Sequence, residues 1–151
     1  MSGGIVGTDM DSNFDKALTF TLKWEGYKSN HEADPGGLTI FGISSKYWPK
    51  EVAEMDKLSQ NEAREIAKKI YKANYWDIAK CGELPYPMDI IVFDTAINCG
   101  VSRAIKFGAL TFNWTDYLFN RLEYYNSLRR PIFMAGWVNR VIDLYRYAKQ
   151  A

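Results

Sequence analysis

Three polar residues near the N-terminal end of the chain have the types expected of a site that cleaves a glycosidic bond: Glu25, Asp34 and Thr39. That reaction needs one carboxylic acid, still protonated near neutral pH, to protonate the leaving oxygen. A second carboxylate activates water or stabilises the cationic sugar. Glu25 follows Trp24, whose indole can shield a carboxyl from water and so favour its protonated form. Asp34 is the candidate second carboxylate.

These residue types also have an ordinary structural explanation. A glutamate in the last turn of a helix is common, and Asp34 can serve simply as the first position of a turn. Thr39 can be an ordinary strand residue. The spacing alone therefore leaves both interpretations open.

The segment that carries these residues has clear local signals. Apolar residues at helical spacing predict a helix over residues 12–25, with Ser12 or Asn13 as its N-cap and Gly26 as its stop. A turn at residues 34–37, Asp-Pro-Gly-Gly, then precedes the β-prone residues 38–41. Residues 27–43 are therefore expected to form a small excursion resembling a β-hairpin.

The rest of the chain is predicted to be helical. Ser59 and Glu62 form the pattern of a capping box. Pro87 opens a stretch that is apolar nearly all round and stops at Gly100, as expected of a buried central helix. Pro131 opens the last helix. The expected fold is mainly α, with helices packed around one buried central helix and a small excursion resembling a β-hairpin near residues 27–43.

Length and composition predict one domain over residues 12–151, preceded by a flexible tail over residues 1–11. The net charge of +1 does not favour nucleic-acid binding. With two cysteines and one histidine, no ordinary zinc site of Cys and His ligands can form, and both thiols are expected to be free. No apolar run is long enough to span a membrane. We therefore expect a monomer without cofactor or metal.

Three motifs resemble those of glycoside hydrolase family 108. The first is Glu25-Gly26-Tyr27 followed by Asp34-Pro35-Gly36-Gly37-x-Thr39-x-x-Gly42-Ile43. The second, at residues 93–100, is similar to the family's central helix, and the third, at residues 136–141, to its C-terminal motif. The family usually has Glu-Gly-Gly-Tyr, so one glycine is missing here. The stretch 107–130 is also shorter than the corresponding segment of many members.

The resemblance implies an α+β lysozyme-like fold for residues 12–151 as a single catalytic domain. It also implies an N-acetylmuramidase, often a phage endolysin that lyses the host cell. It would cleave the β-1,4 bond from N-acetylmuramic acid to N-acetylglucosamine in bacterial peptidoglycan. Glu25 would be the general acid and Asp34 the base or electrostatic partner, while Thr39 would orient the attacking water or Asp34. Two alternatives are a lytic transglycosylase, which needs no water-activating carboxylate, and a wall-binding or secretion-accessory module without catalysis.

Four further residues are candidates for substrate binding: Tyr27, His31, Asn98 and Arg140. Each also has a structural explanation, which for Arg140 is a cation–π contact with the ring of Trp137. Tyr27 can be a core residue and His31 a solvated loop residue. Asn98 shares a helix face with Asp94, so the two can form a hydrogen-bonded structural pair.

The N-terminal residues lack the basic and apolar regions of a signal peptide. Synthesis in the cytoplasm is therefore expected, with action on the cell wall after release by a holin or a secretion system.

Overall fold

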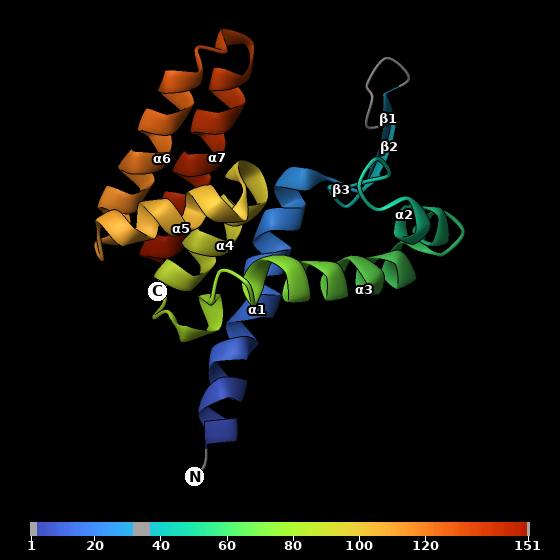
Figure 1. Cartoon of the computed structure of the whole chain (residues 1–151), viewed down its shortest axis with the longest axis horizontal. Coiled ribbons are helices and arrows are strands. Elements are labelled where there is room, and N and C mark those ends of the chain that lie inside the picture. Colours follow the sequence, from blue (N-terminus) through green and yellow to red (C-terminus); the bar gives the residue numbers. More distant parts are fainter. Residues whose placement is uncertain (1–2, 32–36, 151) are drawn as a thin grey trace. The chain divides into compact units, whose positions relative to one another are not determined.

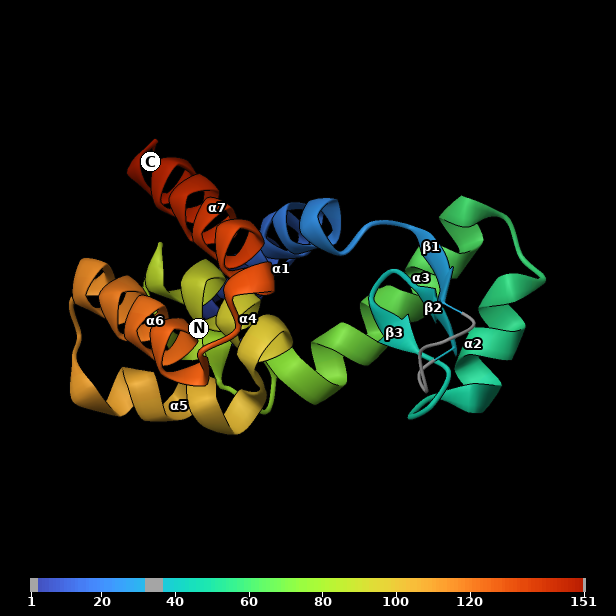
Figure 2. The same ribbon diagram turned by 90° about the horizontal axis from the view of Figure 1, so that it is seen from above.

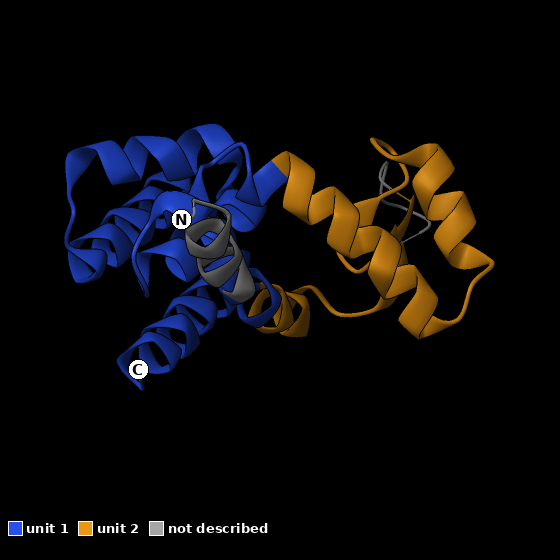
Figure 3. Ribbon diagram, turned by 90° about the horizontal axis from the view of Figure 1, so that it is seen from below, with its two compact units in different colours: residues 1–17, 75–151 blue, residues 18–74 orange. Residues whose placement is uncertain are grey.

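The computed structural model describes the backbone of residues 3–31 and 37–150, and the side chains of residues 13–30 and 37–150. The chain forms two compact units (Figure 3). One contains residues 18–74, and the other contains residues 1–17 and 75–151.

The unit of residues 18–74 combines helices with a small sheet (Figure 1). It contains the C-terminal part of α1 (Gly3–Glu25), strands β1 (Lys28–His31), β2 (Gly37–Ile40) and β3 (Ile43–Ser44), and helices α2 (Pro49–Asp56) and α3 (Gln60–Tyr71). The sheet is antiparallel with the order β1-β2-β3.

The register of this sheet separates an apolar face from a polar one. Ile40 pairs with Lys28 on one side and with Ile43 on the other. Ile40 and Ile43 are buried, and α2 packs against β2 and β3. Side chains alternate between the faces of a strand, so Thr39 lies on the opposite face from these isoleucines.

The other unit is helical. It contains the start of α1, the 3-10 helix η2 (Cys81–Glu83), and helices α4 (Met88–Cys99), α5 (Val101–Leu110), α6 (Trp114–Leu128) and α7 (Pro131–Lys149). The π-helical turn η1 (Lys72–Trp76) spans the boundary between the units. Figures 1 and 2 show α4 lying among α5, α6 and α7.

Burial identifies α4 as the centre of this unit. Its residues Met88 to Ala96 are all buried. The rings of Phe14, Trp76 and Phe93 pack edge to face, with centroids 5.4–5.5 Å apart. Such pairs add specificity to the burial of large apolar surfaces. The predicted buried central helix and the mainly α fold are confirmed.

Several predicted helix boundaries are also confirmed. Ser59 and Glu62 form both hydrogen bonds of a capping box at the start of α3. Gly26, with φ +77°, follows the last residue of α1, and Gly100 caps the end of α4. Pro131 is the first residue of α7.

The N-terminal boundary differs from the prediction. The segment 1–11, expected to be a tail, is helical from Gly3 onward. No proline interrupts residues 3–25, so the backbone hydrogen bonds of α1 continue past Ser12 and Asn13. Asn13 is therefore inside the helix, where its amide donates to Asp89 at 2.9 Å instead of capping. The expectation of one domain over residues 12–151 stays a prediction beside the two units described here.

Two kinds of feature are absent from residues 3–31 and 37–150. No helix there is long and apolar enough to cross a membrane. The same residues contain no group of three or more His, Cys, Asp or Glu side chains that could hold a metal ion. Cys81 and Cys99 are free thiols, as expected.

Candidate functional site

Glu25 is the last residue of α1, at the point where the helix gives way to the sheet. The positive φ of Gly26 ends the helix, and its N–H donates to the carbonyl of Leu22 at 2.9 Å. Glu25 is half-buried, so its carboxyl lies at the edge between protein and solvent. A proton donor for an external substrate needs this combination of fixed position and access.

The turn Phe41–Gly42 lies directly against the Glu25 side chain. If Gly42 carried a Cβ, that atom would stand 2.7 Å from Glu25 Oε1 and 3.0 Å from Glu25 Cγ. It would also stand 2.6 Å from the hydroxyl of Tyr71. These separations are shorter than van der Waals contact, so only glycine lets the carboxyl and the phenol occupy this place.

Two hydrogen bonds to the backbone of Phe41 hold this turn at the base of the hairpin. The Tyr71 hydroxyl donates to the carbonyl of Phe41 at 2.7 Å, in a buried position. The N–H of Phe41 donates to the carbonyl of Tyr27 at 2.5 Å. Phe41 and Gly42 both have positive φ, +51° and +81°, a conformation that a non-glycine residue adopts only when its surroundings enforce it. These contacts hold the Phe41–Gly42 turn, which we call the platform, in a fixed position beside Glu25.

Tyr27 belongs to the same platform. Its ring lies 5.0 Å from that of Phe41, with an interplanar angle of 50°, and the ammonium group of Lys28 lies 5.5 Å from its centroid. It is half-buried. Part of the ring is thus available to a ligand while the rest packs on the turn.

Thr39 lies two residues before the platform, in the middle strand. Its cross-strand partners are Ser29 on β1 and Ser44 on β3. Directly opposed residues project from the same face of a sheet, so the three hydroxyl-bearing residues form a row. Sequence reasoning found Thr39 but missed both serines, since their alignment depends on the register of three strands. A row of hydroxyls can exchange hydrogen bonds with a sugar or with water.

The other predicted residues of this segment can be placed only in part. His31 is the last residue of β1 and pairs with Gly37, but its side chain lies outside the described part. Asp34 also lies outside the described residues. Gly37, the last residue of the predicted turn, has a positive φ of +60°.

Two other carboxylates of this unit have local structural tasks. Asp56 accepts from Lys28 at 2.8 Å in a partly exposed ion pair. Glu62 completes the capping box of α3, and its hydrogen bonds with Ser59 lower its pKa. Glu25 differs from both because its side chain packs against the Phe41–Gly42 turn.

The remaining candidates, Asn98 and Arg140, lie in the helical unit around a buried carboxylate. Asp94, fully buried, forms ion pairs with Arg140 at 2.8 Å and with Arg121 at 2.9 Å. Arg140 binds it through Nε as well as Nη2. The predicted pairing of Asp94 with Asn98 is replaced by this cluster, in which each contacts Arg121.

Asn98 is oriented by the same cluster. Its Oδ1 accepts from the hydroxyl of Tyr125 and lies 3.5 Å from Arg121 Nη2. Arg121 also donates to Thr95 at 3.0 Å and to Tyr125 at 2.7 Å. Because Oδ1 is occupied, the half-buried Asn98 can offer its amide N–H groups to a ligand.

Sequence reasoning missed Arg121 and Tyr125. The available signal was helical spacing, because Tyr117, Leu118, Arg121 and Tyr125 share the buried face of α6. An arginine in such a stripe needs a buried acid. Burial opposes the charge of Arg121, but Asp94 and Tyr125 more than offset this and raise the pKa of its guanidinium.

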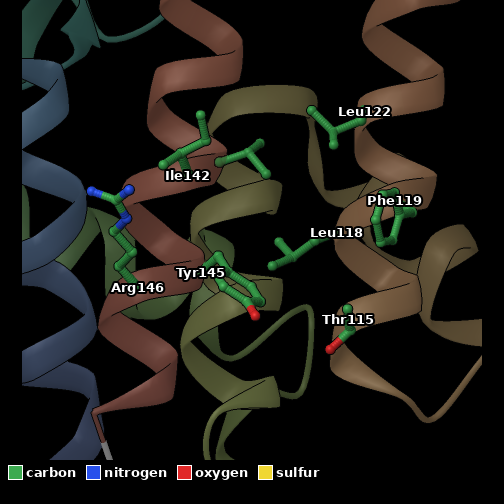
Figure 4. Close-up of a pocket in the computed structure, with 8 residues that line it drawn as sticks. Thr115, Leu118, Phe119, Leu122, Ile142, Tyr145 and Arg146 are labelled. Carbon is green, nitrogen blue, oxygen red and sulfur yellow. The ribbon is translucent and has the colours of Figure 1, made fainter.

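The hollow between α6 and α7 does not contain the predicted catalytic residues (Figure 4). It has a volume of about 520 Å³, and its lining is mainly apolar, including Leu118, Phe119 and Ile142. Its lining residues include no carboxylate, so it cannot supply a carboxylic acid to a glycosidic oxygen.

Comparison with known proteins assigns the family. The model of the family described as Glycosyl hydrolase 108 matches residues 18–100, more than half of the chain. The chain belongs to this family. The resemblance expected from the motifs is confirmed, and the protein is a member of a family of peptidoglycan hydrolases.

One solved structure resembles the whole chain in fold. "Structure of Brucella abortus SagA" is similar with a TM-score of 0.72 and 26% identity, over 93% of this chain and 95% of that chain. No curated protein shows a match. The family match includes Glu25, Thr39 and Asn98, while Arg140 lies beyond its end.

Proposed function

We propose that this protein is a lysozyme-type N-acetylmuramidase that hydrolyses the β-1,4 bond between N-acetylmuramic acid and N-acetylglucosamine, with Glu25 as the general acid. The observation that carries this proposal is the packing of Glu25 on the Phe41–Gly42 turn, where glycine alone leaves room for its carboxyl. A glycoside hydrolase needs an acid in a fixed, accessible position, and Glu25 has both properties.

The reaction assigns one task to each residue. Glu25 donates its proton to the glycosidic oxygen as the bond from C1 to that oxygen breaks. The resulting charge on the sugar is stabilised by the carboxylate of Asp34, which also accepts a proton from the attacking water. Thr39, with Ser29 and Ser44 beside it, orients this water or Asp34. The water oxygen forms the new bond to C1, and Asp34 holds the proton that the water loses while Glu25 is left as a carboxylate. Proton exchange with solvent then returns Glu25 to its acid form and Asp34 to its carboxylate form before the next cycle.

Substrate binding is proposed for Tyr27, His31 and Asn98, and a supporting role for Arg140. Tyr27 would place its partly exposed ring against a sugar face, and His31 would contact the substrate from the end of β1. Asn98 would donate from its amide, whose oxygen is occupied by Tyr125. Arg140 is 5% exposed and paired with Asp94, so it would act mainly by holding this cluster in place.

The products distinguish hydrolysis from the main alternative. Purified peptidoglycan is digested with the full chain, and the released fragments are measured by mass spectrometry. Hydrolysis gives fragments that end in reducing N-acetylmuramic acid. A lytic transglycosylase gives the 1,6-anhydro product, lighter by one water, and that result would contradict the proposal. Binding to sacculi without released fragments would instead indicate a wall-binding module.

The setting proposed for this activity is lysis or secretion through the wall. As an endolysin-like enzyme of a phage or a host, the protein would reach peptidoglycan after release by a holin or a secretion system. It would act there as a monomer without cofactor.

A further inference from the structure

The connection between α6 and α7 exposes apolar side chains beside two arginines. We call residues 128–134 the α6–α7 tip; Figure 1 shows this connection extending beyond α4 and α5. Leu128 is 39% exposed, Ile132 85% and Phe133 46%. Arg129 and Arg130, between them, are also exposed. Isolated exposed apolar residues are ordinary, but a contiguous group indicates a surface that binds something.

The charge of this region has a single sign. From residue 124 to residue 142 the sequence contains three arginines and no aspartate or glutamate. Arg140 is buried and paired with Asp94, which leaves Arg129 and Arg130 as the exposed charges of the segment. The complementary surface must therefore be anionic.

Stacked rings hold the tip in position. Tyr125 stacks on Trp137 with centroids 4.8 Å apart, and Trp137 stacks on Phe133 at 5.6 Å. The guanidinium of Arg130 lies 5.0 Å from the centroid of Phe133. Because Tyr125 is anchored in the Arg121 cluster, this series joins the tip to the core of the helical unit. The guanidinium of Arg130 and the ring of Phe133 are therefore held in place before a partner binds.

A hollow of about 670 Å³ opens beside these arginines. Its lining includes Arg129, Arg130, Asn126 and Ser127. Two guanidinium groups and an amide can donate hydrogen bonds to phosphate oxygens, whereas the hydroxyl of Ser127 already donates to the carbonyl of Tyr124 at 2.6 Å.

We propose that the α6–α7 tip docks this protein onto anionic phospholipid membranes. Arg129 and Arg130 bind lipid phosphates, while Ile132 and Phe133 enter the boundary between headgroups and acyl chains. An anionic wall polymer would satisfy the arginines but would leave Ile132 in water. A lipid surface supplies phosphates for the arginines and also removes Ile132 from water, so it is the favoured partner. The docking is superficial and requires no spanning helix.

The test measures sedimentation of the full chain with vesicles. Vesicles of phosphatidylcholine alone are compared with vesicles of equal parts phosphatidylglycerol and phosphatidylcholine. We expect binding to the anionic vesicles that weakens with added salt, and much weaker binding to the neutral ones. Replacing both Arg129→Gln and Arg130→Gln should lower the partition coefficient about twenty-fivefold, since each cation near such a surface contributes about fivefold. Replacing both Ile132→Ser and Phe133→Ser should lower it at least about tenfold.

Two controls replace exposed residues of the same unit away from the tip. Phe112→Ser removes a fully exposed ring and Lys106→Gln removes an exposed cation, and both should bind like the native chain. Thermal unfolding checks that every variant folds. The proposal is overturned if the native chain does not bind anionic vesicles, if it binds neutral vesicles equally, or if the tip variants bind like the controls. Loss of binding to purified sacculi by the tip variants, without vesicle binding by the native chain, would assign the tip to a wall polymer instead.

Discussion

The carboxyl of Glu25 lies where a side chain on Gly42 would have to be. Glu25 Oε1 is 2.7 Å, and Cγ 3.0 Å, from the position of a Cβ on that glycine. The position of the proposed acid therefore depends on the absence of a side chain at Gly42. Since Gly42 also has a φ of +81°, its backbone favours glycine independently of this contact.

Gly42→Ala should therefore impair activity as well as stability. The new methyl group must displace Glu25 or Tyr71, and a misplacement of about 1 Å can reduce a catalytic rate about a hundredfold. We expect at least that loss in the initial rate of clearing of purified sacculi, measured per folded molecule. Circular dichroism supplies the folded fraction.

Gly100→Ala is the matched control for backbone strain. Gly100 also has a positive φ, +98°, but a Cβ there would meet nothing within 4 Å. This variant should lose about 1–3 kcal/mol of stability from the strained backbone while keeping a near-native rate. Equal losses of rate in the two variants would show that strain, and not the contact with Glu25, explains the Gly42 result.

Tyr71→Phe should destabilise the Phe41–Gly42 turn. The substitution leaves the buried carbonyl of Phe41 without the phenol that donates to it at 2.7 Å. An unsatisfied buried acceptor costs about 1–3 kcal/mol, which urea unfolding can measure. Tyr47→Phe, at a side chain that is 72% exposed, should change stability by less than about 0.5 kcal/mol. A Tyr71→Phe variant as stable as the Tyr47→Phe control would argue against this role.

The elements that carry strong local signals were predictable from sequence. The capping box at Ser59, the stop at Gly26 and the apolar helix that ends at Gly100 each depend on residues close together in the chain. The start of α1 was not predictable in this way. Ser12 and Asn13 are good capping residues, but the helix passes through them.

The arrangement of the site was less predictable because it depends on contacts between distant residues. Nothing near Gly42 in the sequence indicates that Tyr71 and Glu25 meet over it. The row of Ser29, Thr39 and Ser44 follows only from the strand register. Arg121 was missed although its helical spacing placed it on a buried face, and the pairing of Asp94 was assigned to Asn98 instead.

Asp94→Asn should destabilise the helical unit strongly. It leaves the buried guanidinium groups of Arg121 and Arg140 without their carboxylate, a change that typically costs about 3–5 kcal/mol. Asp56→Asn breaks the partly exposed pair with Lys28 and should cost less than about 1 kcal/mol. Urea unfolding of both variants measures the difference, and similar values would show that burial of the Asp94 cluster is energetically unimportant.

Asp89 should make stability depend on pH in a defined direction. Burial raises its pKa, although hydrogen bonds from Asn13 and from the N–H of Ile90 partly oppose this. The folded state therefore holds this proton to higher pH than the unfolded state, whose aspartate pKa is about 3.9. The contribution of Asp89 to the unfolding free energy is full below that value and declines as pH rises through the folded pKa.

Asp89→Asn removes this decline while keeping an oxygen that can accept a hydrogen bond. Relative to the native chain, the variant should therefore become more stable as pH rises from about 3.5 to about 7. Asp15→Asn, at an exposed position of α1, is the control and should show little such trend. A stability difference between the Asp89 variant and the native chain that is constant with pH, or that falls, would contradict the assignment.

The central claim is that Glu25 supplies the proton for glycosidic cleavage, and Glu25→Gln tests it most directly. The amide keeps the size of the side chain but cannot donate a carboxylic proton. The measurement is the initial rate of clearing of purified sacculi by the native chain, by Glu25→Gln, and by Glu54→Gln, which makes the same change at an exposed site of α2. We predict a loss of about 10²–10⁴-fold for Glu25→Gln with native-like stability, and a native rate for Glu54→Gln. A folded Glu25→Gln variant that clears sacculi at the native rate would contradict the account.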